Sequence, residues 1–370
     1  MKAQWLLFLT VCGCGCFAGE AYSPTDPNTV IAHWPSLQQA QVAKNLRPGD
    51  PSTLLVRANH YLTLAAMPGQ SRLYGQVQAL LKPMIESGSD NPQLWLIWAQ
   101  LLQHQHAFAQ ALQALEKVAE RDPNNSAMNL LAARIYLIQD KPAMARQSCL
   151  RLLGHSDLLT TSTCVLEVTS YPQETLIGNN ELKQSYEHLR LLVSREGFPA
   201  DERGPWVAQV LADMAMRLGM PEAAEQWLAS QLHKASVNYL AQWADSQFAQ
   251  GKPQAVIQYL TEVVNAAGEV DDLLLLQLAL AEKKSGETAE LFWQTQLAER
   301  VALREQRQDQ QHADELARYY LEINRQPQKA LYWAQLHWQS SRESKDRALL
   351  DEARAAVAGQ VSLLQGESQQ

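Results

Sequence analysis

The residues with the clearest chemical potential in the body of this chain are two cysteines, Cys149 and Cys164. We expect Cys149 on the second helix of one helical pair and Cys164 on the helix that follows. Neighbouring antiparallel helices can bring two such thiols within reach, which makes them a disulfide candidate in an oxidising compartment. The alternative is a pair of buried thiols, which behave as small hydrophobic groups.

Histidine and carboxylate residues offer little further chemistry by their spacing. His104 and His106 are two positions apart near a helix end, where they point in different directions, whereas a helical metal site places its ligands at i and i+4. We therefore predict a solvated turn tip and no metal site. Asp271, Asp272 and Glu343 near helix ends are predicted to be caps or solvated charges.

The first 21 residues have the pattern of a secretory signal peptide. Lys2 gives a positive start, residues 5–11 form an apolar run broken by one threonine, and small residues lead to a cleavage site after Ala21. The run is too short to cross a bilayer. As an alternative, the Val-Cys-Gly-Cys run loosely resembles a lipobox, which would place a lipid on Cys14. The pattern predicts a periplasmic or secreted protein, or else an outer-membrane lipoprotein.

Composition and missing motifs exclude several classes of function. The net charge of −8 argues against a nucleic-acid binder. After signal cleavage no apolar segment is long enough to span a membrane. The sequence lacks the His-Glu-x-x-His, Gly-x-Ser-x-Gly and Gly-x-x-x-x-Gly-Lys motifs, and no Cys-x-x-Cys pair survives cleavage. We predict no enzymatic activity and no cofactor.

Paired helices that recur about every 34 residues must position these residues. The two clearest copies span residues 92–125 and 126–158. The first copy is marked by Trp95, Trp98, Ala99, Leu102, Ala111, Leu115, Val118 and Pro123. One repeat later stand Ala133, Tyr136, Ala145, Cys149 and Leu152. Each copy indicates two amphipathic helices that cannot bury their apolar stripes alone, so the copies must stack.

Turn residues extend the repeat along the chain. Gly219-Met220-Pro221 is echoed by Gly251-Lys252-Pro253, with glycine ending one helix and proline in the first turn of the next. The slot of this proline is filled by Phe108, Pro142, Pro221, Pro253 and Pro327, followed three residues later by Ala111, Ala145, Ala224, Val256 and Ala330. The predicted organisation is a signal peptide (1–21), a Pro-rich lead-in (22–50), an N-terminal array (51–197), a joint (198–204), a C-terminal array with a capping helix (205–358) and a flexible tail (359–370).

These markers resemble the tetratricopeptide repeat family. Repeat 92–125 departs from the family pattern where Ala99 replaces a glycine and at the aromatic position of its second helix. The resemblance covers 92–158 well and 205–338 moderately, and it implies an all-α, right-handed solenoid whose first helices line a groove. Fold alone does not specify function.

The resemblance also implies which residues line that groove. Carried over, the groove positions are Gln93, Leu96, Gln100, Arg134, Trp206, Gln209, Asp213, Arg217, Asp245, Phe248 and Tyr319. This polar and aromatic mixture suits a protein or peptide partner, with Arg134 and Trp206 as anchors. The alternative is that these positions are solvated helix faces. Leu96, Gln100 and Leu131 stand where a family subclass uses lysine and asparagine to grip a C-terminal carboxylate, so we do not predict that ligand.

The sequence therefore favours a non-catalytic envelope scaffold that binds an envelope protein or peptide in its concave groove and assists assembly or maturation of envelope complexes. The alternative is an outer-membrane lipoprotein that regulates wall hydrolases or a pilus or secretion machine. Homo-oligomerisation is a further expectation, because stacked repeats with an exposed end can associate.

Overall fold

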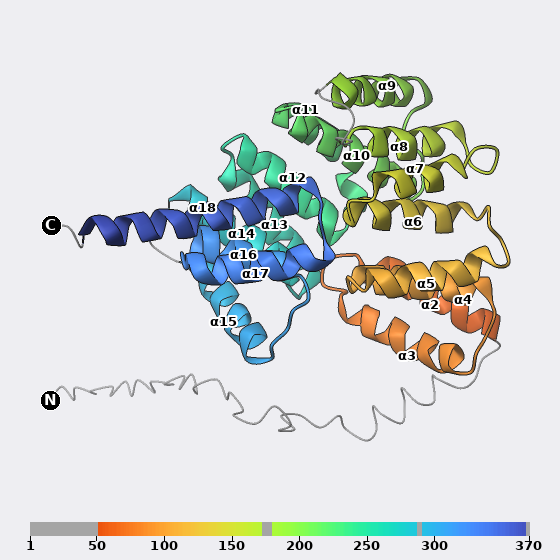
Figure 1. The fold of residues 1–370 in the computed structure, drawn as a ribbon, viewed down its shortest axis with the longest axis horizontal. Helices are drawn as coiled ribbons and strands as arrows, with labels where there is room; N and C mark the ends of the chain where they lie inside the picture. The colour runs from red at the N-terminus through yellow and green to blue at the C-terminus, as the bar shows by residue number, and fades with distance from the viewer. Residues whose placement is uncertain (1–50, 172–179, 287–290, 368–370) are drawn as a thin grey trace, which may run out of the picture. The chain divides into compact units, whose positions relative to one another are not determined.

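The protein is an array of paired antiparallel helices (Figure 1). The computed structural model describes residues 51–171, 180–286 and 291–367, and within these ranges every regular element is helical. This confirms the predicted all-α solenoid of tetratricopeptide-like helix pairs. The predicted signal peptide, the Pro-rich lead-in and Cys14 lie outside the described residues.

The helices alternate between a first and a second member of each pair. The N-terminal pairs are α2 (Pro51–Ala65) with α3 (Arg72–Glu86), α4 (Pro92–His104) with α5 (Phe108–Ala119), α6 (Ser126–Ile138) with α7 (Pro142–Leu150), and α8 (Leu158–Thr169) with α9 (Asn180–Glu196). The C-terminal pairs are α10 (Arg203–Arg217) with α11 (Pro221–Ala229), α12 (Val237–Ala249) with α13 (Pro253–Ala267), α14 (Asp272–Ser285) with α15 (Phe292–Gln306), and α16 (Ala313–Arg318) with α17 (Pro327–Ser340). Short turns η1 (Leu232–Lys234) and η2 (Tyr319–Ile323, a π-helix) interrupt the pattern, and α18 (Ser344–Glu367) ends it.

Local chemistry fixes where these helices begin. The side chains of Asn91, Asn125 and Asp157 accept hydrogen bonds from backbone N–H groups of the first turns of α4, α6 and α8. The predicted proline slot is the first residue of the second helices, as at Pro142 and Pro221, where the missing N–H costs no hydrogen bond. The small residues three positions later are fully buried, so the two helices of each pair can approach closely.

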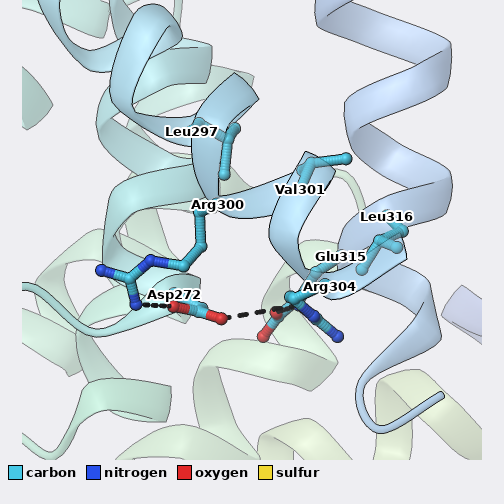
Figure 2. A pocket seen from close by; sticks show the side chains of 7 residues that line it. All are labelled: Asp272, Leu297, Arg300, Val301, Arg304, Glu315 and Leu316. Carbon is cyan, nitrogen blue, oxygen red and sulfur yellow. Dashed lines mark hydrogen bonds and ion pairs between the residues drawn. The ribbon is translucent and has the colours of Figure 1, made fainter. Parts of the chain in front are cut away.

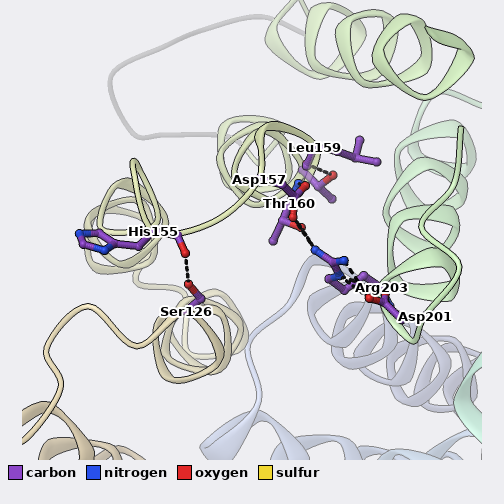
Figure 3. A network of polar contacts seen from close by, with 8 residues as sticks. Ser126, His155, Asp157, Leu159, Thr160, Asp201 and Arg203 are labelled. Atoms are coloured by element: carbon purple, nitrogen blue, oxygen red, sulfur yellow. Dashed lines mark hydrogen bonds and ion pairs between the residues drawn. The ribbon is translucent and has the colours of Figure 1, made fainter. Parts of the chain in front are cut away.

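The predicted joint contains tight polar contacts. Arg203 lies between Asp157 at the start of α8 and Asp201 in the joint, and also donates to the Thr160 hydroxyl at 3.1 Å (Figure 3). One hydrophobic cluster continues across this region, joining Leu189 of α9 to residues of α10 and beyond. The division into two arrays stays a prediction.

The C-terminal end differs from the expectation. The predicted capping helix ends near residue 357 and a flexible tail begins at 359, whereas α18 continues to Glu367. No proline interrupts this stretch, so nothing in its backbone chemistry stops the helix.

The chain returns on itself between its first turn and its later pairs. The Val237 N–H donates to the Ala66 carbonyl at 2.9 Å, and the Gly69 N–H donates to the Asp271 carboxylate at 2.7 Å. Gly69 has a φ of +71°, and a Cβ there would lie 2.9 Å from the Cβ of Ala267. This turn therefore needs glycine both for its backbone conformation and for the close approach of α13.

Substituting Gly69→Ala should lower the free energy of unfolding more than Gly219→Ala does. Both positions have a left-handed backbone, at a cost of about 1–2 kcal/mol for alanine. Only Gly69 meets another segment, which adds about 1–3 kcal/mol of overpacking. Urea unfolding of the two variants measures the difference. Equal losses would contradict the contact between this turn and α13.

Cys149 of α7 and Cys164 of α8 are joined as a disulfide, with their Cα atoms 5.5 Å apart. Both residues are buried in one core cluster with Ala133 and Leu152. The bond closes a loop with a sequence separation of 15 residues. It therefore connects two successive helix pairs covalently.

Reduction of this disulfide should destabilise the protein by about 3 kcal/mol, because a loop of this length restricts the unfolded chain. Peptide mapping without reductant should recover Cys149 and Cys164 in one linked peptide. A Cys149→Ala, Cys164→Ala double variant should lose comparable stability and should then be insensitive to reductant. Free thiols at both positions would rule the bond out.

Candidate protein-binding surface

Polar side chains link the first helices of successive pairs. We call this set the inner ladder. Its members are Arg134 of α6, Glu167 of α8, Asp213 and Arg217 of α10, Asp245 of α12, Gln277 of α14 and Arg318 of α16. The contacts of Arg134 with Glu167 and of Asp245 with Gln277 and Arg318 join different first helices. Asp213 and Arg217 pair within α10, and Arg217 reaches the end of α8 at Ser170. The ladder is therefore a product of the stacking itself.

Arg134 forms the first step of the ladder. Its Nη1 lies 3.4 Å from Glu167, and its Nη2 lies 3.0 Å from Glu343. The Arg134 side chain is 40% exposed, whereas Glu167 and Glu343 are 12% and 9% exposed. The guanidinium thus satisfies two buried carboxylates while part of its surface still faces solvent.

Arg217 forms the second step. Its Nη1 and Nη2 donate to the carbonyl and hydroxyl of Ser170 at 2.8 and 2.6 Å, and its Nε donates to Asp213 at 2.9 Å. The guanidinium also lies 4.3 Å above the Tyr171 ring. This arrangement fixes the C-terminus of α8 against α10.

The third step joins three helices. Asp245 accepts from Gln277 and from Arg318, each at 3.3 Å. Asp245 keeps 44% of its side chain exposed. Acidic groups thus stay accessible at this end of the ladder, while Arg134 supplies accessible positive charge at the other.

The chain's own connector, residues 341–343 between α17 and α18, lies against the first step. The Arg342 N–H donates to the Ile138 carbonyl at 2.7 Å, and Glu343 pairs with Arg134. Figure 1 shows these ends of α17 and α18 beside α6. Asp346 closes the connector by accepting from the Ser341 hydroxyl and the Glu343 N–H at 2.5 and 2.9 Å. The surface therefore holds a non-helical segment by main-chain and charged contacts together.

Burial and charge act in opposite directions on the two carboxylates. Burial raises the pKa of Glu167 to about 7, although Arg134 acts to lower it. Burial also acts to raise the pKa of Glu343, but Arg134 and Lys345 outweigh it, so this pKa lies below its ordinary value. Arg134 therefore stabilises the charged form of Glu343 more than that of Glu167.

The structure separates the predicted groove residues into two groups. Arg134, Asp213, Arg217 and Asp245 belong to the inner ladder, while Gln93 is exposed and Gln100, Gln209 and Phe248 are half-buried. Trp206 packs against two hydrophobic clusters, so its ring also serves the core. The role of these residues in binding a partner stays a prediction.

Two of the predicted groove residues are core residues instead. Leu96 is 7% exposed because α4 lies between two hydrophobic clusters, and Tyr319 is 4% exposed. Tyr319 opens the π-helical η2 and packs in one core cluster with Tyr320 and Trp333. These two residues are not surface groups available to a partner.

Three predictions about polar residues at helix ends were wrong. Glu343 is buried against Arg134 rather than solvated. Asp271 makes no side-chain cap of α14 and accepts from the Gly69 N–H instead. His104 and His106 are half-buried and pack near His312, at ring-centroid distances of 5.7 and 4.6 Å. In each case the partner comes from a distant part of the chain.

Sequence reasoning missed Glu167, Gln277 and Arg318 of the ladder, and it missed Ser170, which accepts hydrogen bonds from Arg217. A signal for Glu167 was present, because Arg134 and Glu167 are 33 residues apart, close to one repeat. Opposite charges at this interval indicate facing side chains on consecutive first helices. The contacts of Ser170 had no such signal, because they depend on where α8 ends.

A small cavity elsewhere is too tight for a ligand. Asp272, Arg300, Arg304 and Glu315 surround it, with Leu297, Val301 and Leu316 (Figure 2). Its volume is about 10 Å³, which holds one water molecule at most. Arg304 lies 2.7 Å from Glu315 and also donates to the carbonyls of Gln311 and His312. The ion pairs therefore position the turn before α16.

No group of three or more His, Cys, Asp or Glu side chains among the described residues is arranged to hold a metal ion. No described helix is both long and apolar enough to cross a membrane.

Comparisons with known proteins add only fold-level likeness. No family model matches the sequence, and no curated protein matches it. Matching solved structures include PilW, described as a widely conserved type IV pilus biogenesis factor (14% identity, TM-score 0.38, 58% of this chain and 93% of that chain). Others are the APC/C hetero-tetramer Cut9-Hcn1 (15%, 0.46, 86% and 59%) and the P58(IPK) TPR domain (12%, 0.25, 82% and 99%). At identities and TM-scores this low they carry no argument about function. The tetratricopeptide-like fold is evident from the chain's own helix pairs.

Glu167 should make stability depend on pH. Because its folded-state pKa is raised from 4.5 to about 7, its stabilising contribution is present below pH 4.5 and is lost as the pH rises towards 7, by up to about 3 kcal/mol. Glu167→Gln should remove this part of the decline in urea unfolding between pH 5 and pH 8. Glu187→Gln, on an exposed ion pair of α9, is the matched control. Superimposable profiles of wild type and Glu167→Gln would contradict the assignment.

Proposed function

We propose that this protein is a non-catalytic scaffold of the cell envelope that binds an extended segment of a partner protein along its inner ladder. The observation that carries the proposal is the connector. The first step of the ladder already holds a non-helical polypeptide segment, by one main-chain hydrogen bond at Ile138 and one ion pair at Arg134.

Charge and exposure support a protein partner. Arg134 is 40% exposed and Asp245 is 44% exposed, so the ladder offers accessible groups of both signs at different steps. Arginine that is partly exposed and already oriented by carboxylates loses little freedom when it binds another carboxylate. An extended segment with an acidic residue at one end and a basic residue towards the other would match this order.

The envelope location and the absence of catalysis rest on the sequence. The signal pattern of the first 21 residues supports export. The lack of recognised reaction motifs supports a binding role, in keeping with the helix pairs that the described residues form. Assistance in the assembly or maturation of envelope complexes is the role that fits an exported repeat protein of this kind.

Arg134→Glu should weaken partner binding at least tenfold, because it reverses the charge at the first step of the ladder. Crosslinking of tagged protein in intact cells, followed by mass spectrometry, identifies the partner, and titration of the purified pair measures affinity. Arg190→Glu is the matched control, since Arg190 is 42% exposed and pairs with Glu187 on the second helix α9.

The triple variant Arg134→Glu, Glu167→Gln, Glu343→Arg separates binding from folding. It recreates an ion pair between α6 and the connector with the charges exchanged, and it removes the buried carboxylate that the new glutamate would otherwise face, so the fold should recover while the reversed surface still repels the partner. Binding that persists in Arg134→Glu, or that falls equally in Arg190→Glu, would contradict the proposed surface.

A further inference from the structure

Four histidines gather where the first pairs of the chain meet the last ones. His104 and His106 come from the turn between α4 and α5, His312 from the turn before α16, and His337 from α17. The ring centroid of His106 lies 4.6 Å from that of His312 and 6.0 Å from that of His337. His104 lies 5.7 Å from His312 and stacks on Tyr74 of α3 at 3.5 Å. We call this set the histidine clasp.

Both charge signs surround the clasp, but not evenly. His337 lies between Asp346 of α18, at 3.1 Å, and Asp314 of α16, at 3.5 Å. His312 faces Asp309, Asp314 and the Arg304 guanidinium, and His106 faces Asp314, His337 and Lys345. His104 stacks on the Tyr74 ring, and the charge effects on it come from His312 and His106. The carboxylates are thus concentrated on His337, which leaves the other three imidazoles without a closely paired anion.

Burial favours the neutral form of these three imidazoles. Together with a smaller effect of neighbouring His312, it lowers the pKa of His104 to about 3 and that of His106 to about 4. Burial also lowers the pKa of His312. His337 differs, because Asp346 and Asp314 overcome its burial and raise its pKa. Protonation of His106 or His312 would therefore add a positive charge near His337, whose charged form is already favoured.

The backbone at the clasp is strained in a way that glycine would relieve. His106 and His312 have φ values of 56° and 48°, in the left-handed region. The equivalent turns after α10 and α12 use Gly219 and Gly251. Left-handed non-glycine residues cost free energy and persist where other contacts require them. Here Arg304 holds the turn of His312 in place through the Gln311 and His312 carbonyls (Figure 2 shows the ion pairs that orient Arg304).

Solvent reaches the clasp through an open cavity of about 440 Å³. His106 and His337 line it together with Gln308, Asp309, Gln311 and Ser340. Protons can therefore exchange with the imidazoles without unfolding of the helices.

We infer that the histidine clasp is an acid-sensitive closure, in which protonation of His104, His106 and His312 separates the α4–α5 turn from the C-terminal turns. The effect reaches the connector, because His337 contacts Asp346 and Asp346 closes residues 341–343. Opening of the clasp is independent of the proposed function. The further step, in which opening of the clasp releases the inner ladder for a partner, rests on the proposed function.

The pH window follows from the direction of the shifts. The open state binds protons with an ordinary histidine pKa of 6.5, whereas the closed state binds them at about 4 for His106 and about 3 for His104. The closed state is therefore favoured above pH 6.5, and that stability is lost as the pH falls from 6.5 towards 4. His337 opposes this trend, since its raised pKa stabilises the closed state at low pH. The shifts of His104 and His106 are large and His312 adds to them, so acid opens the clasp.

Hydrogen exchange of the full chain at pH 7.5 and pH 5.0 tests this inference. The reporters are the Val237 amide, which donates to Ala66, and the Arg342 amide, which donates to Ile138. After correction for intrinsic exchange rates, both should exchange at least tenfold faster at pH 5.0. Amides within α10 should keep their protection. Equal acceleration throughout α10 would mean global acid unfolding and would overturn the inference.

Glycine variants separate the imidazoles from the backbone. His106→Gly and His312→Gly together remove two imidazoles while relieving the left-handed strain, so the fold should hold and the pH effect should fall to one third of its wild-type size or less. Asp140→Gly is the matched control, because Asp140 has the same φ of 56° at the turn after α6. It should retain the full effect. An unchanged effect in the double variant, or an equal loss in Asp140→Gly, would overturn the inference.

Discussion

The structure depends on the close approach of the two helices in each pair. Ala111, Ala145, Ala224 and Ala330 are fully buried on the second helices, where a larger side chain would separate the helices. Once a pair is formed, its apolar stripes are only half covered, so the next pair must stack on it. The inner ladder follows from this constraint, because the first helices then present one face each to their neighbours.

Stacking alone would give an open array in which each pair contacts only its neighbours. This chain adds contacts between its beginning and its end: Ala66 with Val237, His106 with His312, and Arg134 with Glu343. Contacts that close long loops couple distant pairs, so the opening of one end is no longer independent of the other. The polar character of these contacts matters, since a hydrophobic closure of the same extent would not respond to pH or to a charged partner.

The sequence predicted what depends on neighbouring residues. Helix pairs, the proline slot and the small residues beside it could be identified because the period, the turns and the caps are local properties. Arg134, Asp213 and Asp245 could be predicted to share one face of the array, because equivalent positions in successive repeats point in the same direction. The assignment failed at Tyr319 and at Leu96, because both side chains pack into hydrophobic clusters that several helices build together.

The remaining features depend on the return of the chain, which no local pattern encodes. His104 and His106 read as a solvated turn because their neighbours in space, His312 and His337, are distant in sequence. Glu343 read as a solvated charge for the same reason. Periodicity fixes the geometry within a pair, but the small rotation between pairs decides whether the array meets itself, and that rotation accumulates from side-chain packing at every interface.

The connector sets a condition on any partner of the inner ladder. A segment tethered within the same chain acts at a high effective concentration, in the millimolar range for short flexible tethers. A partner that competes for Arg134 must therefore displace Glu343. Its apparent affinity is its intrinsic affinity multiplied by the fraction of molecules in which the connector has left Arg134. Weakening the connector raises that fraction without any new contact to the partner. The ion pair of Arg134 with Glu343 and the contact of His337 with Asp346 are the two places where charge can do this. Selectivity in such a surface comes as much from what must be displaced as from what is bound.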